Sequence, residues 1–132
     1  MTVGTLNNTS VSDDGYGDYT GQSTTLLIGQ SYPISLSPGF NSFPYNEWFR
    51  VYIDQDHDGQ FSASEVVYDA GSASSAIAIG QLTVPATALP GSTRLRVIMR
   101  YNAAPTDGCQ DGYDYGETED YCVTLNSTVR DR

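Results

Sequence analysis

The 132-residue chain has no helical periodicity, and this absence constrains its fold most strongly. No stretch carries apolar residues at the i, i+3, i+4 and i+7 positions over three turns, as an amphipathic helix requires. Short runs rich in β-branched and aromatic residues appear in its place, separated by Gly, Pro, Asn, Asp and Ser. The runs are 24–28, 31–36, 48–53, 66–68, 81–84, 94–101 and 121–125. This pattern predicts a single all-β domain over residues 1–132, an antiparallel, jelly-roll-like β-sandwich.

Two of the runs alternate between core-facing and outward-facing positions, as strands with one buried face do. In the run 48–53, the side chains expected to face the core are Phe49, Val51 and Ile53. The opposite face of that run carries Trp48, Arg50 and Tyr52. In the run 94–101, one face carries Leu95, Val97, Met99 and Tyr101, and the other Arg94, Arg96, Ile98 and Arg100.

The charge balance excludes several classes of partner. Sixteen acidic residues stand against six basic ones, all of them arginine, and the formal net charge is −10. Such a surface repels the phosphates of nucleic acids, so we expect no nucleic-acid partner. No apolar run is long enough for a membrane-spanning helix, and the first residues lack the basic and apolar regions of a signal peptide. We therefore expect no membrane partner either.

The few histidine and cysteine residues limit the possible chemistry. His57 is the only histidine, and Cys109 and Cys122 are the only cysteines. A nucleophilic triad or a zinc site would have to draw on these three residues. Two cysteines outside a C-x-x-C pair favour a disulfide between Cys109 and Cys122, with two free thiols as the alternative. A disulfide indicates an oxidising compartment, so we expect an extracellular domain cut from a larger secreted protein.

The strongest local pattern is the segment 54–65, which fits the twelve-position calcium loop. The acids at positions 1, 3, 5 and 12 are Asp54, Asp56, Asp58 and Glu65. Gly59 permits the sharp turn at position 6, and Gln60 offers its backbone carbonyl at position 7. Hard oxygen ligands in this order predict a Ca²⁺ site, with an acidic turn free of metal as the alternative.

The residues flanking this loop predict strands rather than the helix pair of an EF-hand. A loop between strands has no helix pair to open, so the ion is expected to stabilise the fold rather than to regulate it. His57, at position 4, is expected to point away from the metal.

Several segments together resemble one known family. Residues 116–125 are Gly-Glu-Thr-Glu-Asp-Tyr-Cys-Val-Thr-Leu, and residues 52–61 are Tyr-Ile-Asp-Gln-Asp-His-Asp-Gly-Gln-Phe. With 83–85 (Thr-Val-Pro) and 91–97 (Gly-Ser-Thr-Arg-Leu-Arg-Val), they resemble the GEVED domain, although Thr118 stands where the family usually has Val. Residues 18–20 and 32–34 extend the likeness over about residues 14–126. The resemblance implies a β-sandwich accessory module of secreted bacterial proteins, found beside proteases, polysaccharide-degrading enzymes or adhesive repeats, and it brings no catalytic residues.

Acidic residues are concentrated near the last of these segments. Six of them, within fourteen residues, are Asp107, Asp111, Asp114, Glu117, Glu119 and Asp120. Such density is repulsive unless cations balance it. Arg94 and Arg96 can supply that balance from a neighbouring strand, or acids such as Glu117, Glu119 and Asp120 can complete the calcium shell or form a second metal site. Catalysis by a pair of these carboxylates is not expected, because a domain this small lacks room for a deep cleft.

Ten tyrosines, four phenylalanines and one tryptophan exceed the needs of a small core. Aromatic rings stack on sugars, and arginine forms paired hydrogen bonds with carboxylate or sulfate. Trp48, Arg50 and Tyr52, extended by Arg100, are therefore one candidate ligand surface, and Tyr113 with Tyr115 is a second. The alternative is that the aromatic side chains pack under loops and that the arginines balance nearby acids.

These features favour a non-enzymatic, calcium-stabilised carbohydrate-binding module of a secreted bacterial polysaccharide-degrading enzyme, with an anionic polysaccharide as one candidate ligand. The alternative is a protein-binding domain, collagen-type or adhesive, or a structural spacer in a secreted protease or surface protein. In either case we expect a monomeric unit within a multidomain chain.

Overall fold

The computed structural model describes residues 2–4, 6–7, 16–36, 47–72, 77–101 and 116–127. These residues form nine strands and one short 3₁₀ helix. The strands are β1 (Thr2–Val3), β2 (Leu6–Asn7), β3 (Tyr16–Leu27), β4 (Ser31–Leu36), β5 (Glu47–Ile53), β6 (Val66–Asp69), β7 (Ala78–Thr83), β8 (Gly91–Tyr101) and β9 (Gly116–Asn126). The 3₁₀ helix η1 (Ala63–Glu65) directly precedes β6. The described part of the chain contains no helix long and apolar enough to cross a membrane.

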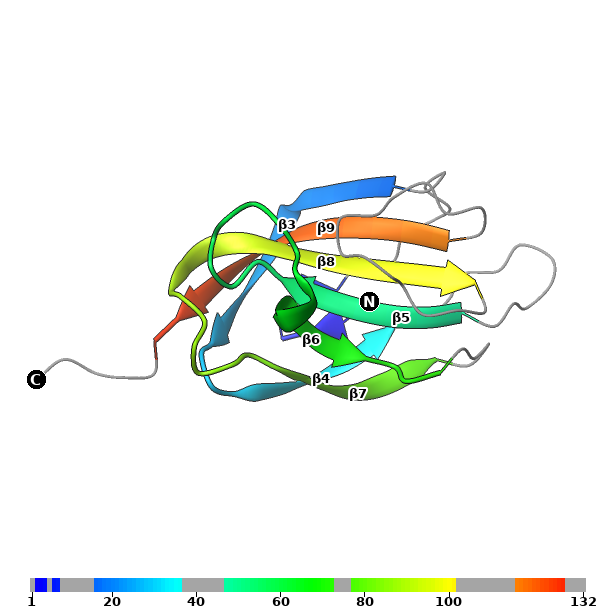
Figure 1. Ribbon diagram of the computed structural model, residues 1–132, viewed down its shortest axis with the longest axis horizontal. Helices are drawn as coiled ribbons and strands as arrows, with labels where there is room; N and C mark the ends of the chain where they lie inside the picture. Colours follow the sequence, from blue (N-terminus) through cyan, green and yellow to red (C-terminus); the bar gives the residue numbers. More distant parts are fainter. Residues whose placement is uncertain are drawn as a thin grey trace, which may run out of the picture.

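The strands form two sheets in a sandwich-like arrangement (Figure 1). One sheet has four strands in the order β2-β1-β4-β7, and the other has five in the order β3-β9-β8-β5-β6. The all-β prediction is therefore confirmed. The chain passes from the five-stranded to the four-stranded sheet between β6 and β7, so these two edge strands lie near each other.

The expectation of a purely antiparallel fold is wrong for one pair, because β3 and β9 run parallel. These strands come from opposite ends of the chain, so no hairpin turn dictates their relative direction. Their register breaks between Tyr19 and Ser23, where β3 carries extra residues. All other strand pairs in the described residues are antiparallel.

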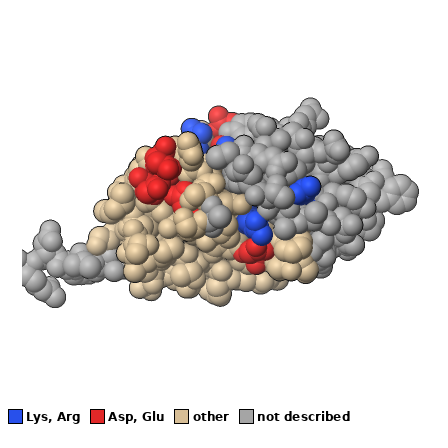
Figure 2. Space-filling model, in the orientation of Figure 1, with Lys and Arg blue, Asp and Glu red and all other residues tan. Residues whose placement is uncertain are grey.

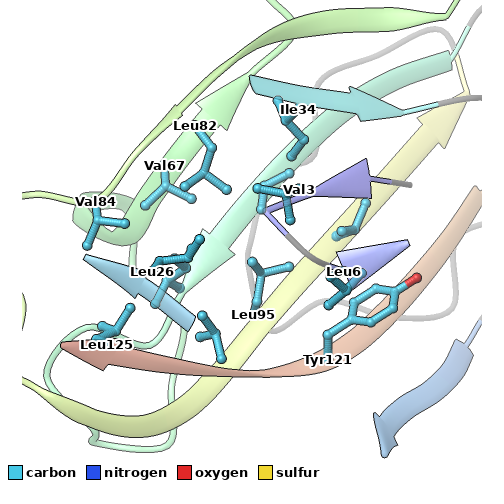
Figure 3. Packing of buried hydrophobic residues seen from close by; sticks show 14 of the residues in the cluster. Val3, Leu6, Leu26, Ile34, Val67, Leu82, Val84, Leu95, Tyr121 and Leu125 are labelled. Carbon is cyan, nitrogen blue, oxygen red and sulfur yellow. The ribbon is translucent and has the colours of Figure 1, made fainter. Parts of the chain in front are cut away.

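Buried apolar side chains from both sheets meet between the layers (Figure 3). Phe49, Val51 and Ile53 of β5 are buried there, as their alternation predicts. Ile34 of β4 and Leu82 of β7 reach the same core from the opposite sheet. Burial of these faces removes apolar area from water, which is the main favourable contribution to folding.

A second, smaller apolar cluster lies on the outer face of the five-stranded sheet. It consists of Tyr52 from β5, Ile98 from β8 and Phe61 from the loop after β5, with Val66 packed against it. The loop is therefore attached to the sheet by an apolar contact as well as by its ends.

Candidate metal centre and neighbouring surface

The segment 54–65 connects β5 to β6 and lies over the outer face of the five-stranded sheet (Figure 1). Phe61 fixes it there, with its ring packed edge-on against Tyr52 at a centroid separation of 6.1 Å. Asp54 directly follows β5, and Glu65 ends η1 directly before β6. The two outermost acids of the loop are therefore positioned by regular strands rather than by the loop alone.

Backbone amides in the loop are directed at its carboxylates. The amides of Asp58 and Gly59 donate to the two carboxylate oxygens of Asp54, at 3.2 and 2.9 Å. The amide of Gln60 donates to Asp58 Oδ1 at 2.9 Å. The turn that allows this places His57 at φ 59° and Gly59 at φ 82°, in the left-handed region that favours glycine.

Glu65 closes the loop from its other end. Its Oε2 accepts hydrogen bonds from the amides of Gln55, at 2.6 Å, and Asp56, at 3.4 Å. Its Oε1 accepts one from the amide of Ser62, at 3.0 Å. The Glu65 side chain is buried, so these bonds satisfy a carboxylate that water cannot reach.

The four acids predicted as ligands lie together. One carboxylate oxygen from each of Asp54, Asp56, Asp58 and Glu65 lies within 4.8 Å of the others, and this group could hold a metal ion. Ligands on opposite sides of Ca²⁺ are about 4.6–5.2 Å apart, whereas those of Mg²⁺ are about 4.0–4.2 Å apart. Figure 2 shows acidic side chains gathered in a compact patch on this face of the molecule. The four acids could therefore hold a metal ion, while its identity as calcium and the contribution of the Gln60 carbonyl stay predictions.

The pKa values of Asp54 and Asp56 are shifted in opposite directions. Burial raises the pKa of Asp54, and the charge of Glu65 and a hydrogen bond with Asp56 raise it further, against the amides of Gly59 and Asp58. Desolvation raises the pKa of Asp56, but hydrogen bonds with Asp58, Asp54 and Glu65 together outweigh it, and the pKa falls. The like charges of neighbouring carboxylates oppose one another's ionisation. A bound divalent cation removes this conflict, because it favours the charged form of all four.

His57 is not one of the clustered groups. Its Nε2 donates to the backbone carbonyl of Leu89 at 3.0 Å, and its ring lies against Gly91. The Leu89 amide in turn donates to the carbonyl of Gln55. The Thr93 hydroxyl donates to the carbonyl of Asp54 at 2.8 Å. The start of the metal loop is thus bound to the connection between β7 and β8 and to the first residues of β8, a contact that the sequence analysis did not identify.

The acidic motif on β9 is connected to the same loop through arginine. Arg96 donates from Nε and Nη2 to the two carboxylate oxygens of Asp120, at 2.7 and 2.9 Å. Asp120 is fully buried, and Arg94 lies at 3.7 Å from its Oδ2. The Arg96 guanidinium also lies over the Phe61 ring, 4.7 Å from its centroid. The sequence left two roles open for Asp120, pairing with arginine or binding a metal, and the described contacts of Asp120 are those of an arginine pair.

The other acids of that region are accounted for differently. Glu119 is buried and accepts a hydrogen bond from the Tyr121 hydroxyl at 2.7 Å. The side chain of Glu117 and the residues Asp107, Asp111 and Asp114 lie outside the described part of the structure. Within that described part, Asp54, Asp56, Asp58 and Glu65 are the only acidic group with the geometry of a metal site.

The first candidate ligand surface has a partner that the sequence analysis missed. Asp69, the last residue of β6, accepts the indole N–H of Trp48 at 2.7 Å. It also accepts Arg50 Nε at 2.9 Å and Arg50 Nη2 at 2.6 Å. Burial raises the pKa of Asp69, but the bonds from Trp48, Gly71 and Arg50 outweigh it and lower the pKa. Arg100 lies directly across from Trp48 on β8.

For the predicted ligand surfaces, the role given to Tyr52 needs correction and the role given to Tyr113 and Tyr115 stays open. Tyr52 is only 2% exposed, because Phe61 of the loop covers it, so its ring is not available for stacking on a ligand. Tyr113 and Tyr115 lie outside the described residues.

The predicted disulfide between Cys109 and Cys122 is not seen in the described residues. Cys122 is a free, partly buried thiol there, while Cys109 lies outside them. Its formation stays a prediction.

Comparison with known proteins gives one family match. A family model for the GEVED domain matches residues 48–124, which is more than half of the chain and includes both the acidic loop and the motif on β9. No curated protein and no solved structure matches the chain. The chain therefore belongs to the GEVED domain family.

Proposed function

We propose that this domain is a non-catalytic, calcium-stabilised carbohydrate-binding module of a secreted bacterial polysaccharide-degrading enzyme. The observation that carries the proposal is that Asp69 holds Trp48 and Arg50 side by side on the outer face of the five-stranded sheet. A sugar ring stacks on an aromatic face, while polar groups beside it fix its orientation. A ring and a guanidinium that are already held lose less conformational entropy on binding.

The ion pair favours an uncharged polysaccharide over the anionic one. Arg50 is already paired with Asp69, so a carboxylate or sulfate of the ligand would have to compete with that acid for it. The net charge of −10 also disfavours the binding of an anionic polymer, because like charges repel.

Calcium supports this surface through the strand that carries Asp69. Glu65, the last acid of the metal loop, directly precedes β6, and Asp69 is the last residue of that four-residue strand. An ion held by Glu65 fixes the start of β6 and so restrains the side chain that orients Trp48 and Arg50. A jelly-roll connection of the strands, the finer expectation for the fold, stays a prediction.

The second candidate function is a protein-binding domain, collagen-type or adhesive, or a structural spacer. The burial of Tyr52 favours it, since the outer face then offers one tryptophan ring rather than two stacked aromatic positions. Such a role places the domain in a secreted protease or a surface protein rather than in a polysaccharide-degrading enzyme.

Affinity electrophoresis through gels that contain neutral or anionic polysaccharides separates these functions. We expect a neutral polysaccharide to retard the calcium-saturated domain, and Trp48→Ala to abolish most of the retardation. Arg50→Ala is expected to weaken binding, while Arg94→Ala, the same change on the same sheet away from Asp69, leaves it intact. If no polysaccharide retards the protein, or if Trp48→Ala migrates like the parent, the carbohydrate-binding proposal is wrong.

A further inference from the structure

The charged residues of this domain are distributed unevenly between its two sheets. In the part of the chain that the structure describes, every charged residue lies in a strand of the five-stranded sheet or in the loop between β5 and β6. The strands of the four-stranded sheet, β1, β2, β4 and β7, contain none. In a chain with a net charge of −10, the described strands of this sheet add no charge that would repel a second acidic molecule.

The strand β7 forms an open edge of this charge-free sheet. It is the terminal strand, and Figure 1 shows it at the rim of the molecule with no strand beyond it. Its register with β4 is continuous from Ala78 to Thr83, without a bulge. It contains no proline and no charge. Charges, prolines, bulges and short length are the features by which edge strands avoid pairing with other chains, and β7 has none of them.

The other three edge strands described in the structure are protected in these ways. β2 has only two residues. β3 contains Asp18, and its register breaks between Tyr19 and Ser23. β6 has four residues, ends in Asp69, and shows a register shift against β5. The contrast makes β7 the edge that is open to pairing.

Exposed isoleucine side chains mark the same edge. Ile79 is 76% exposed, and Ile77, directly before the strand, is 55% exposed. On the inner side, the Tyr68 ring packs so closely on Gly80 that a Cβ there would lie 2.6 Å from it. The strand is therefore supported from the core while its outer side chains remain uncovered. Isolated exposed apolar residues are common, but one on an unprotected edge strand with a second directly before it is typical of a pairing site.

We propose that β7 pairs with β7 of a second copy of this chain, antiparallel and about a twofold axis, so that the two four-stranded sheets join into one. In both copies the acidic loop belongs to the other sheet. Cross-strand neighbours on the outer face then include the isoleucines of both copies. A single six-residue strand pair is a small interface, so the dimer is weak and reversible rather than obligate. The monomeric unit expected from the sequence is the alternative that the experiment tests.

Sedimentation equilibrium of the calcium-saturated domain tests this proposal. The weight-average mass is expected to rise from monomer toward dimer between about 10 µM and about 1 mM, the range of weak association. Ile79→Lys is expected to weaken the association by tenfold or more, because it places like charges across the joint strands. Leu89→Lys is the matched control, since Leu89 is also exposed, lies outside β7 and gives the same change in net charge. It should leave the association unchanged.

Amide hydrogen exchange locates the contact and does not depend on a variant. At the higher concentration, amides of residues 78–83 are expected to gain protection, while those of β2, β3 and β6 are not. A protein that stays monomeric throughout the range overturns the proposal, as does a dimer that Ile79→Lys and Leu89→Lys weaken equally. If only residues outside β7 gain protection, the proposal is also overturned, because the interface then lies elsewhere.

Discussion

Arg96 and Asp120 form a two-point ion pair in which the carboxylate is completely buried and the guanidinium also covers the Phe61 ring. The pair joins three separate parts of the sequence: the strand β8, the acidic motif on β9 and the metal loop. A buried charge is tolerated only when it is paired and hydrogen-bonded. The acidic motif of the family therefore has a structural role in this chain, at least at Asp120.

Breaking this pair is predicted to destabilise the fold strongly. Arg96→Met leaves Asp120 buried without its main partner, and removal of one member of such a pair costs about 3–5 kcal/mol. The double variant Arg96→Met with Asp120→Leu removes both charges and is expected to cost much less. Urea unfolding of the two single variants and the double variant measures the coupling. If the losses in free energy of unfolding of the two single variants add up to the loss in the double variant, Arg96 and Asp120 are not energetically coupled.

Calcium is predicted to stabilise the domain by binding only the folded state. At a free concentration one hundred times the dissociation constant, the gain is about 2.7 kcal/mol. Glu65→Gln and Asp54→Asn remove ligand charge and are expected to abolish most of this gain. Differential scanning calorimetry with calcium and with a chelator measures it.

Asp18→Asn is the matched control for this experiment, because Asp18 is an exposed acid on β3 outside the cluster. Its response to calcium should equal that of the parent. An unchanged melting temperature of the parent protein in chelator would contradict the metal site.

The sequence predicts the parts of this domain that depend on local patterns. Alternation identifies Phe49, Val51 and Ile53 as core residues, and the loop spacing brings Asp54 and Glu65 to one place. Both patterns are physical consequences of chain geometry within a dozen residues, namely the two-residue period of a strand and the fixed turn of the loop.

The parts that could not be predicted depend on contacts between distant segments. The parallel pairing of β3 with β9 has no local signal, because no turn connects the two strands. Asp69 reaches Trp48 and Arg50 only because the β5–β6 register shifts between Val51 and Tyr52. One signal in the sequence pointed to the burial of Tyr52. Phe61 is an apolar residue in an otherwise polar loop, so it needed an apolar surface to pack on, and that surface includes Tyr52.

The stability of the Trp48–Asp69–Arg50 group is predicted to depend on pH in a defined direction. The folded-state pKa of Asp69 is lowered, so its contribution is fully present above the unfolded value of about 3.9 and is lost as the pH falls through the folded value. Melting curves of the parent and of Asp69→Asn in chelator measure this contribution between neutral and strongly acidic pH. Their difference should be constant above about pH 5 and shrink below about pH 4. A difference that grows as the pH falls would contradict the ion pair.

At Gly59, the cost of a left-handed backbone can be measured without the cost of steric overlap. Gly59 has a φ of 82°, yet a Cβ added there would meet no atom within 4 Å. Gly59→Ala is therefore expected to cost about 1–2 kcal/mol through the left-handed backbone alone, and to weaken calcium binding as the turn distorts. Gly21→Ala is the matched control, since a Cβ at Gly21 also meets nothing and its φ lies outside the left-handed region. It should be neutral or slightly stabilising, because alanine restricts the unfolded chain. Urea unfolding of both variants, with and without calcium, decides the point: equal effects would mean that the Gly59 turn does not control the loop.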